Sequence, residues 1–89
     1  MSELHEHRVK RLAMRSMRRG IKEMDLILSA FADAKLAAMT DAQLTVYDVM
    51  LDENDHDLYQ WVTGQVEPTV RYGEVIDDIR GFIASRDMS

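Results

Sequence analysis

The chain has 89 residues, a single proline, no cysteine and a formal net charge of −5. This length suits one small domain with one hydrophobic core. The lack of cysteine excludes disulfides, thiolate zinc sites and cysteine nucleophiles. We expect a single helical domain over residues 1–89, with about residues 8–85 ordered.

The composition also bears on location. No run of about 18 apolar residues is present, so we expect no membrane span. Glu3 and Glu6 argue against a transit peptide, since such peptides are poor in acidic residues. The sequence therefore predicts a cytoplasmic protein that does not associate with membranes.

Apolar residues recur at helical spacing in five segments, and no segment alternates as a strand does. The first segment runs from about Leu4 to Arg18. The second begins at Gly20, and its inward face is marked by Met24, Ile27, Leu28 and Phe31. Met14 and Met17, which lie between arginines, are expected to be exposed.

The third segment opens with Thr40 and Gln43 in the spacing of a capping box. A short fourth helix follows the acidic run 52–57, buries Trp61 and ends at Gly64. The fifth spans about 70–85, with an apolar face of Val75, Ile76, Ile79, Phe82 and Ile83. Together these segments predict an all-α fold, a small compact five-helix bundle.

Charge is distributed unevenly along the chain. Residues 1–23 hold seven Lys or Arg against three acidic residues, a net charge of +4, whereas the remainder has a net charge of −9. The stretch RSMRRGIKE, residues 15–23, lies at the centre of the basic part. It is the first candidate for a functional surface.

A purely structural interpretation accounts for part of this stretch. Arg18 and Arg19 would meet the negative end of the first helix dipole. Gly20 would supply a positive φ, or the N-cap of the second helix. Glu23, three residues later, would reach back to the N-cap N–H. On this interpretation the segment is a corner between two helices.

Five further cations near the corner are not explained in this way, because like charges repel unless a partner neutralises them. They are Arg8, Lys10, Arg11, Arg15 and Lys22. An acidic or carbonyl-rich protein surface is the favoured partner. The alternative is a nucleic-acid-binding or antitoxin-like regulator that uses the basic first helix. The acidic remainder and the lack of a base-reading helix disfavour it.

No residue pattern indicates catalysis or metal binding. His5 and His7 lie near the expected frayed end of the first helix, and His56 lies in the acidic run. That run fails the calcium-loop pattern, because Asp57 stands at the position of the turn glycine and Thr63 at that of the bidentate glutamate. We expect no catalytic, cofactor-binding or metal-binding residues, and Asn54 or Asp55 to cap the next helix.

The corner and its context resemble a known family. RSMRRGIKEMDLIL is followed by Phe31, by DxDLYxWVTG (residues 55–64) and by Pro68. This arrangement resembles the succinate dehydrogenase assembly factor 2 family, the SdhE flavinylation factors, some of which carry an antitoxin name. The likeness covers about residues 8–83, and the family's Arg-Gly-x-x-Glu motif matches Arg19, Gly20 and Glu23.

The resemblance implies a five-helix assembly factor that is not itself an enzyme. Its partner would be the flavoprotein subunit of succinate dehydrogenase, and also the related fumarate reductase. It would promote covalent attachment of FAD to a histidine of that client, so FAD would belong to the client. Arg19, Gly20 and Glu23 would contact the client, with Arg15 and Arg18 beside them. We expect a monomer, and a general helix-in-groove adaptor with another client remains a further alternative.

Overall fold

A computed structural model describes residues 3–87. It confirms the predicted all-α fold with five helices, and residues 3–87 contain no strand. The α-helices are α1 (His5–Arg15), α2 (Lys22–Lys35), α3 (Asp41–Met50), α4 (Asp55–Val62) and α5 (Gly73–Asp87), with short 3₁₀ turns η1 (Leu36–Ala38) and η2 (Val70–Tyr72).

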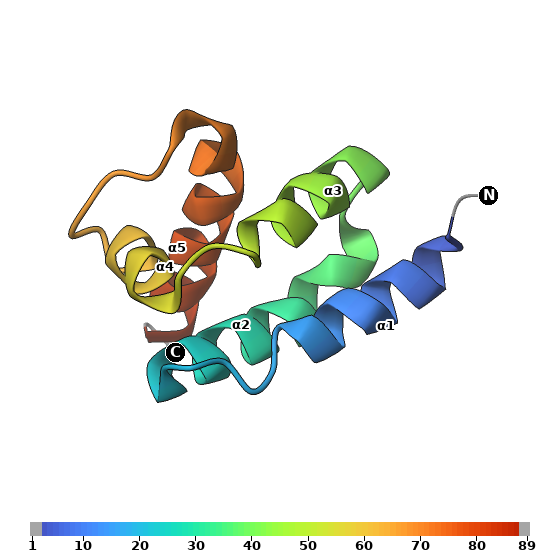
Figure 1. Ribbon diagram of the computed structural model, residues 1–89, viewed down its shortest axis with the longest axis horizontal. Coiled ribbons are helices and arrows are strands. Elements are labelled where there is room, and N and C mark those ends of the chain that lie inside the picture. Colours follow the sequence, from blue (N-terminus) through green and yellow to red (C-terminus); the bar gives the residue numbers. More distant parts are fainter. Residues whose placement is uncertain (1–2, 88–89) are drawn as a thin grey trace.

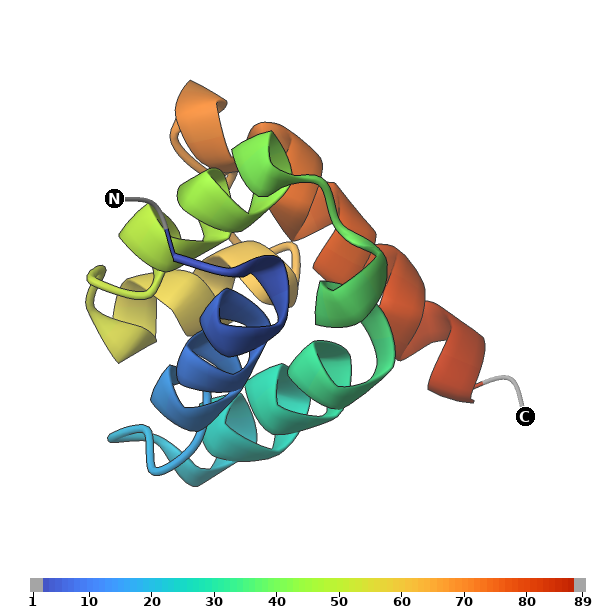
Figure 2. The ribbon, with the colours of Figure 1, turned by 90° about the vertical axis from the view of Figure 1, so that its right-hand side faces the viewer.

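The helices enclose one interior. α1 and α2 run side by side along one edge, α3 packs against α1, and α4 and α5 lie together at the other end (Figure 1). α2 contacts α1, α4 and α5, so it connects the two ends of the molecule. The view turned by 90° shows α1, α2, α3 and α5 around the common interior (Figure 2).

The core contains most of the side chains that the helical spacing predicts, whereas Ile27, Phe82 and Ile83 are only partly buried against it. Trp61 and Met24 are buried, as expected, whereas Met14 and Met17 are exposed, also as expected. Each buried large apolar side chain contributes about 1.5–3 kcal/mol of transfer free energy. The buried apolar residues are Leu12, Met24, Leu28, Phe31, Ala32, Leu36, Leu44, Tyr47, Met50, Leu51, Leu58, Trp61, Val62, Tyr72, Val75, Ile76 and Ile79.

Helix ends follow the predicted capping residues in the second half of the chain. Thr40 and Gln43 form a complete capping box at the start of α3. Asn54 caps α4 by accepting a hydrogen bond from the backbone N–H of His56 at 2.8 Å. Gly64 follows α4 with a φ of +81°, the left-handed conformation that stops a helix.

The first helix ends earlier than predicted, at Arg15 rather than Arg18. Ser16, which is fully buried, donates a side-chain hydrogen bond to the carbonyl of Leu12 at 2.8 Å. Its Oγ also lies 2.6 Å from the hydroxyl of Tyr47 in α3. Ser16 is the C-cap of α1, and its backbone N–H still bonds to the Leu12 carbonyl at 3.0 Å. The chain leaves the helical path two residues later, at Arg18, whose φ is +57°.

Replacing Ser16 by alanine should lower the free energy of unfolding by about 1–2 kcal/mol, because the buried Tyr47 hydroxyl loses its partner. Burial already raises the pKa of Tyr47 to about 12, against the opposing hydrogen bond from Ser16. Tyr47→Phe should lower the free energy of unfolding by less than Ser16→Ala does, since the Ser16 hydroxyl keeps the Leu12 carbonyl as its acceptor. Urea unfolding of both variants and their double mutant measures the difference. Equal stability of wild type and Ser16→Ala would contradict the expectation.

Candidate functional site

The corner between α1 and α2 is built by residues 16–21. Arg18 has a φ of +57°, the only positive φ outside glycine in residues 3–87. Its backbone N–H donates to Asp25 Oδ1 at 3.0 Å, and Ser29 donates to the same oxygen at 3.2 Å. The prediction that Gly20 supplies the positive φ is wrong, because the chain reverses at Arg18.

Arg19 and Gly20 both bind one carboxylate, that of Asp55 at the start of α4. The Arg19 Nε donates to Asp55 Oδ1 at 2.8 Å, and Nη2 lies 2.6 Å from the same oxygen. The Gly20 backbone N–H donates to Oδ2 at 2.5 Å. The Arg19 and Asp55 side chains are only 13% and 15% exposed, so this ion pair is largely shielded from water. We call these three residues the Asp55 clamp.

Helix dipoles support the Asp55 clamp from both sides. Arg19 also donates to the carbonyls of Leu51 at 3.0 Å and Glu53 at 3.4 Å, just after α3 ends. A cation is favoured at the C-terminal end of a helix, and a carboxylate such as Asp55 is favoured in a first turn. The Asp55 clamp therefore joins the corner to the connection between α3 and α4.

Gly20 is required for close approach. A Cβ atom added at Gly20 would lie 3.0 Å from Asp55 Oδ2, tighter than ordinary contact. The carboxylate has little freedom to retreat, because Arg19 holds its other oxygen. A residue without a side chain lets the backbone N–H reach the carboxylate.

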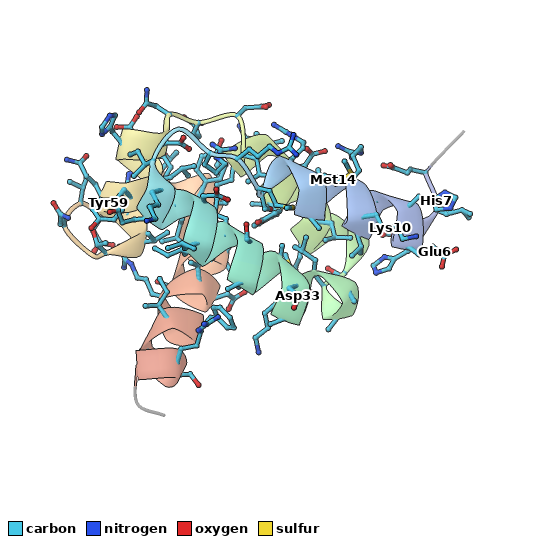
Figure 3. All side chains as sticks on the ribbon, turned by 90° about the horizontal axis from the view of Figure 1, so that it is seen from below. Glu6, His7, Lys10, Met14, Asp33 and Tyr59 are labelled. Atoms are coloured by element: carbon cyan, nitrogen blue, oxygen red, sulfur yellow. The ribbon has the colours of Figure 1, made fainter. Side chains whose placement is uncertain are left out.

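Glu23 lies exposed in the first turn of α2. The predicted capping box is absent, since the N-cap of α2 is Ile21 and receives no side-chain hydrogen bond. Glu23 instead stands at the rim of a groove of about 490 Å³ between α2, α4 and α5. Leu26, Ile27 and Tyr59 line the same groove, and Figure 3 labels Tyr59.

The three arginines of α1 bind acceptors in α3 and the turn after it. Arg15 pairs with Asp48 and, at 2.5 Å, with Asp52, while Arg11 lies 3.1 Å from Asp48. Burial alone would raise the pKa of Asp48, but its hydrogen bonds and the charges of both arginines outweigh burial and lower it. Arg8 donates to Thr45 Oγ1 at 2.5 Å.

These contacts correct the argument from surplus charge for Arg8, Arg11 and Arg15, whereas Lys10 and Lys22 lie exposed. The sequence suggested that an outside protein surface neutralises the cations of the first helix. The acidic, carbonyl-rich surface that receives Arg8, Arg11 and Arg15 is the chain's own α3 and the turn after it. Arg15 is therefore a structural residue as much as a candidate contact.

The acidic run 52–57 is used internally. Asp52 pairs with an arginine of α1, Glu53 accepts the hydroxyl of Tyr72 at 2.7 Å, Asn54 caps α4, and Asp55 forms the clamp. Among the described side chains of residues 3–86, no three His, Asp or Glu groups lie close enough together to hold a metal ion. No helix in that range is both long and apolar enough to cross a bilayer.

The Asp55 clamp was not predicted from the sequence. Arg19 and Gly20 were selected as contacts for a partner, and Asp55 only as a possible cap. The available signal was that Asp55 belongs to the stretch that carried the family resemblance. Its role was hidden because Arg19 and Asp55 are 36 residues apart, and local periodicity says nothing about such pairings.

Fold and corner define the class of this protein: a small all-α protein whose motif residues lie at a fixed corner beside an apolar groove. The chain belongs to the family described as "Flavinator of succinate dehydrogenase", whose profile matches residues 10–83. The resemblance found in the sequence is thereby confirmed.

Curated relatives agree with the family assignment. A zebrafish (Danio rerio) protein is 43% identical over 82 residues, which cover 89% of this chain and 52% of the relative. A protein from Meyerozyma guilliermondii is 45% identical over 67 residues, which cover 75% of this chain and 50% of the relative. A protein from Aspergillus terreus is 57% identical over 53 residues, which cover 60% of this chain and 18% of the relative. Each is named "Succinate dehydrogenase assembly factor 2, mitochondrial", and the chain spans about half of their length or less.

The predicted cytoplasmic location is contradicted by these relatives, which are named as mitochondrial proteins. The prediction relied on Glu3 and Glu6 as signs of a missing transit peptide. Glu3 pairs with Arg11 at 3.0 Å, so its charge stabilises the start of the fold. It therefore carries no information about the compartment.

Proposed function

We propose that this protein is an assembly factor that promotes covalent attachment of FAD to the flavoprotein subunit of succinate dehydrogenase. The observation that carries the proposal is the family match over residues 10–83, which includes all five predicted site residues. The related fumarate reductase flavoprotein is proposed as a second client. We propose that the factor acts as a monomer and holds no cofactor of its own, the FAD belonging to the client.

The proposed mode of action is binding rather than catalysis. A factor that prefers the reactive arrangement of its client shifts the client toward that arrangement, by as much as its affinity for the two states differs. Correct positioning of two reacting groups alone is able to lower a barrier by several kcal/mol, up to about 7–11. A fixed corner suits this role, because a rigid surface loses little entropy on binding.

We propose that the residues of the motif have two different roles. Arg19 and Gly20 hold Asp55 and give the corner its shape. The Glu23 side chain is exposed, makes no hydrogen bond or ion pair with the described side chains and backbone, and borders the apolar groove. We propose that Glu23 contacts the client and that the groove beside it receives an apolar client segment.

Replacing Glu23 by alanine should slow client flavinylation about tenfold, the loss expected when an interface contact of roughly 1.4 kcal/mol is removed. Stability should change by no more than about 0.5 kcal/mol, since the side chain is exposed. The assay follows covalent FAD on the purified flavoprotein subunit with time.

Asp33→Ala is the matched control, because Asp33 is an exposed acid on the same helix but outside the groove (Figure 3). It should support flavinylation at the wild-type rate. Wild-type rates for Glu23→Ala would show that Glu23 is not a client contact. No acceleration by the wild-type protein would refute the proposed function itself.

A further inference from the structure

The arginines of α1 and the corner fall into two groups. Arg8, Arg11, Arg15 and Arg19 all donate to acceptors within the chain. Arg18 is different: its side chain is exposed and forms no hydrogen bond or ion pair with any other residue from 3 to 87. Arg18 is therefore the arginine of the corner whose guanidinium is available to a partner.

Arg18 occupies a conformation that does not favour arginine. Its φ of +57° lies in the left-handed region, which glycine and asparagine adopt at lower cost. The backbone is held there by Asp25, whose carboxylate accepts the Arg18 N–H. Strained backbone of this kind tends to occur at functional sites, where it fixes the direction of a side chain.

Two exposed methionines adjoin Arg18. Met14 is 73% exposed and Met17 is 50% exposed. The Met17 N–H bonds to the Met14 carbonyl at 3.2 Å, so the two residues belong to the same final turn before the reversal. Methionine adapts its shape to apolar partners, and its exposure is typical of binding surfaces. Figure 3 labels Met14 on the visible side of α1.

We propose that Arg18, Met14 and Met17 form a second contact surface, which binds a client segment carrying a carboxylate next to apolar side chains. This inference rests on the proposed function and adds the chemistry of the partner. The guanidinium would bind the carboxylate through two parallel hydrogen bonds, and the methionines would cover the adjoining apolar side chains.

A protein segment fits this surface better than nucleic acid does. Nucleic-acid binding draws on several free cations in one place. Arg8, Arg11 and Arg15 are held by acceptors in α3 and the turn after it, which leaves the exposed Lys10 and Lys22 as the cations near Arg18 without such a partner in the described part of the chain. Asp25 also lies at the base of the corner, where it would repel a second phosphate. The exposed guanidinium of Arg18, next in the chain to the exposed Met17, matches a carboxylate with apolar neighbours.

The test compares Arg18→Gly, Arg18→Glu and the control Lys35→Glu, which changes an exposed cation at the far end of α2. Binding to the purified flavoprotein subunit is measured by calorimetry, and unfolding midpoints by urea. Arg18→Gly should fold with an unchanged or higher midpoint, since glycine relieves the strained φ. Its Kd should nevertheless rise about tenfold, and that of Arg18→Glu by more. Lys35→Glu should bind as the wild type does.

Three results would overturn the inference. If both Arg18 variants bind the subunit with wild-type Kd and support its flavinylation, the surface is wrong while the proposed function stands. If they bind the subunit normally but lose salt-dependent binding to a single-stranded oligonucleotide, the surface serves nucleic acid instead. Failure of the wild-type protein to promote flavinylation would refute the proposed function and this inference with it.

Discussion

Replacing Asp55 by alanine is expected to lower the free energy of unfolding by about 2–4 kcal/mol, the largest single effect predicted for this chain. The variant leaves the guanidinium of Arg19 without its carboxylate in a site that is largely closed to water. It also removes the acceptor of the Gly20 N–H. The total free energy of unfolding of a domain of this size is about 4–13 kcal/mol. The midpoint of urea unfolding should therefore fall markedly.

Asp52→Ala provides the matched control. Asp52 also pairs with an arginine, Arg15, but its side chain is 73% exposed. Exposed ion pairs contribute about 0–1 kcal/mol, and Arg15 keeps Asp48 as a partner. If Asp52→Ala and Asp55→Ala lowered the free energy of unfolding by similar amounts, the Asp55 clamp would have no special role in stability.

Replacing Gly20 by arginine is expected to lower the free energy of unfolding by about 2–3 kcal/mol. The same variant is expected to lose the ability to stimulate flavinylation of the client. The new Cβ would stand 3.0 Å from Asp55 Oδ2, so the carboxylate must leave the backbone N–H or Arg19. Overpacking and a lost charge-assisted hydrogen bond are each of this order. Urea unfolding and the flavinylation assay measure the two effects on the same sample.

Gly81→Arg is the control for this variant. Gly81 lies within α5, and a Cβ there would meet nothing within 4 Å. Arginine has a higher helix propensity than glycine, so the free energy of unfolding is expected to rise by up to about 1 kcal/mol. Wild-type stability for Gly20→Arg would contradict the close approach at the corner. If a folded Gly20→Arg protein stimulated flavinylation as the wild type does, the corner would not be part of the surface that contacts the client.

The sequence was sufficient to predict those features that depend on neighbouring residues. Helical spacing identified Met24 and Trp61 as core residues, and Thr40 with Gln43 as a capping box. These predictions succeed because burial of one helix face and capping are decided within a few residues.

The features that the sequence did not reveal depend on residues far apart in the chain. Asp48 receives two arginines of α1, and Asp55 receives Arg19, across separations of more than 30 residues. Charge counts show that such partners exist but not that they belong to the same chain. The left-handed backbone at Arg18 was missed because glycine, two positions later, is the residue that usually adopts it.

The Asp55 clamp also has a consequence for the order of folding. Its two sides come from segments 36 and 35 residues apart, so closing it requires α1 and α2 to meet the turn before α4. Contacts of such sequence separation form only after a large loop has been closed, which costs chain entropy. The motif is therefore presented in its final shape only by a chain that has already docked its two halves. We therefore expect a partly folded chain to lack this corner.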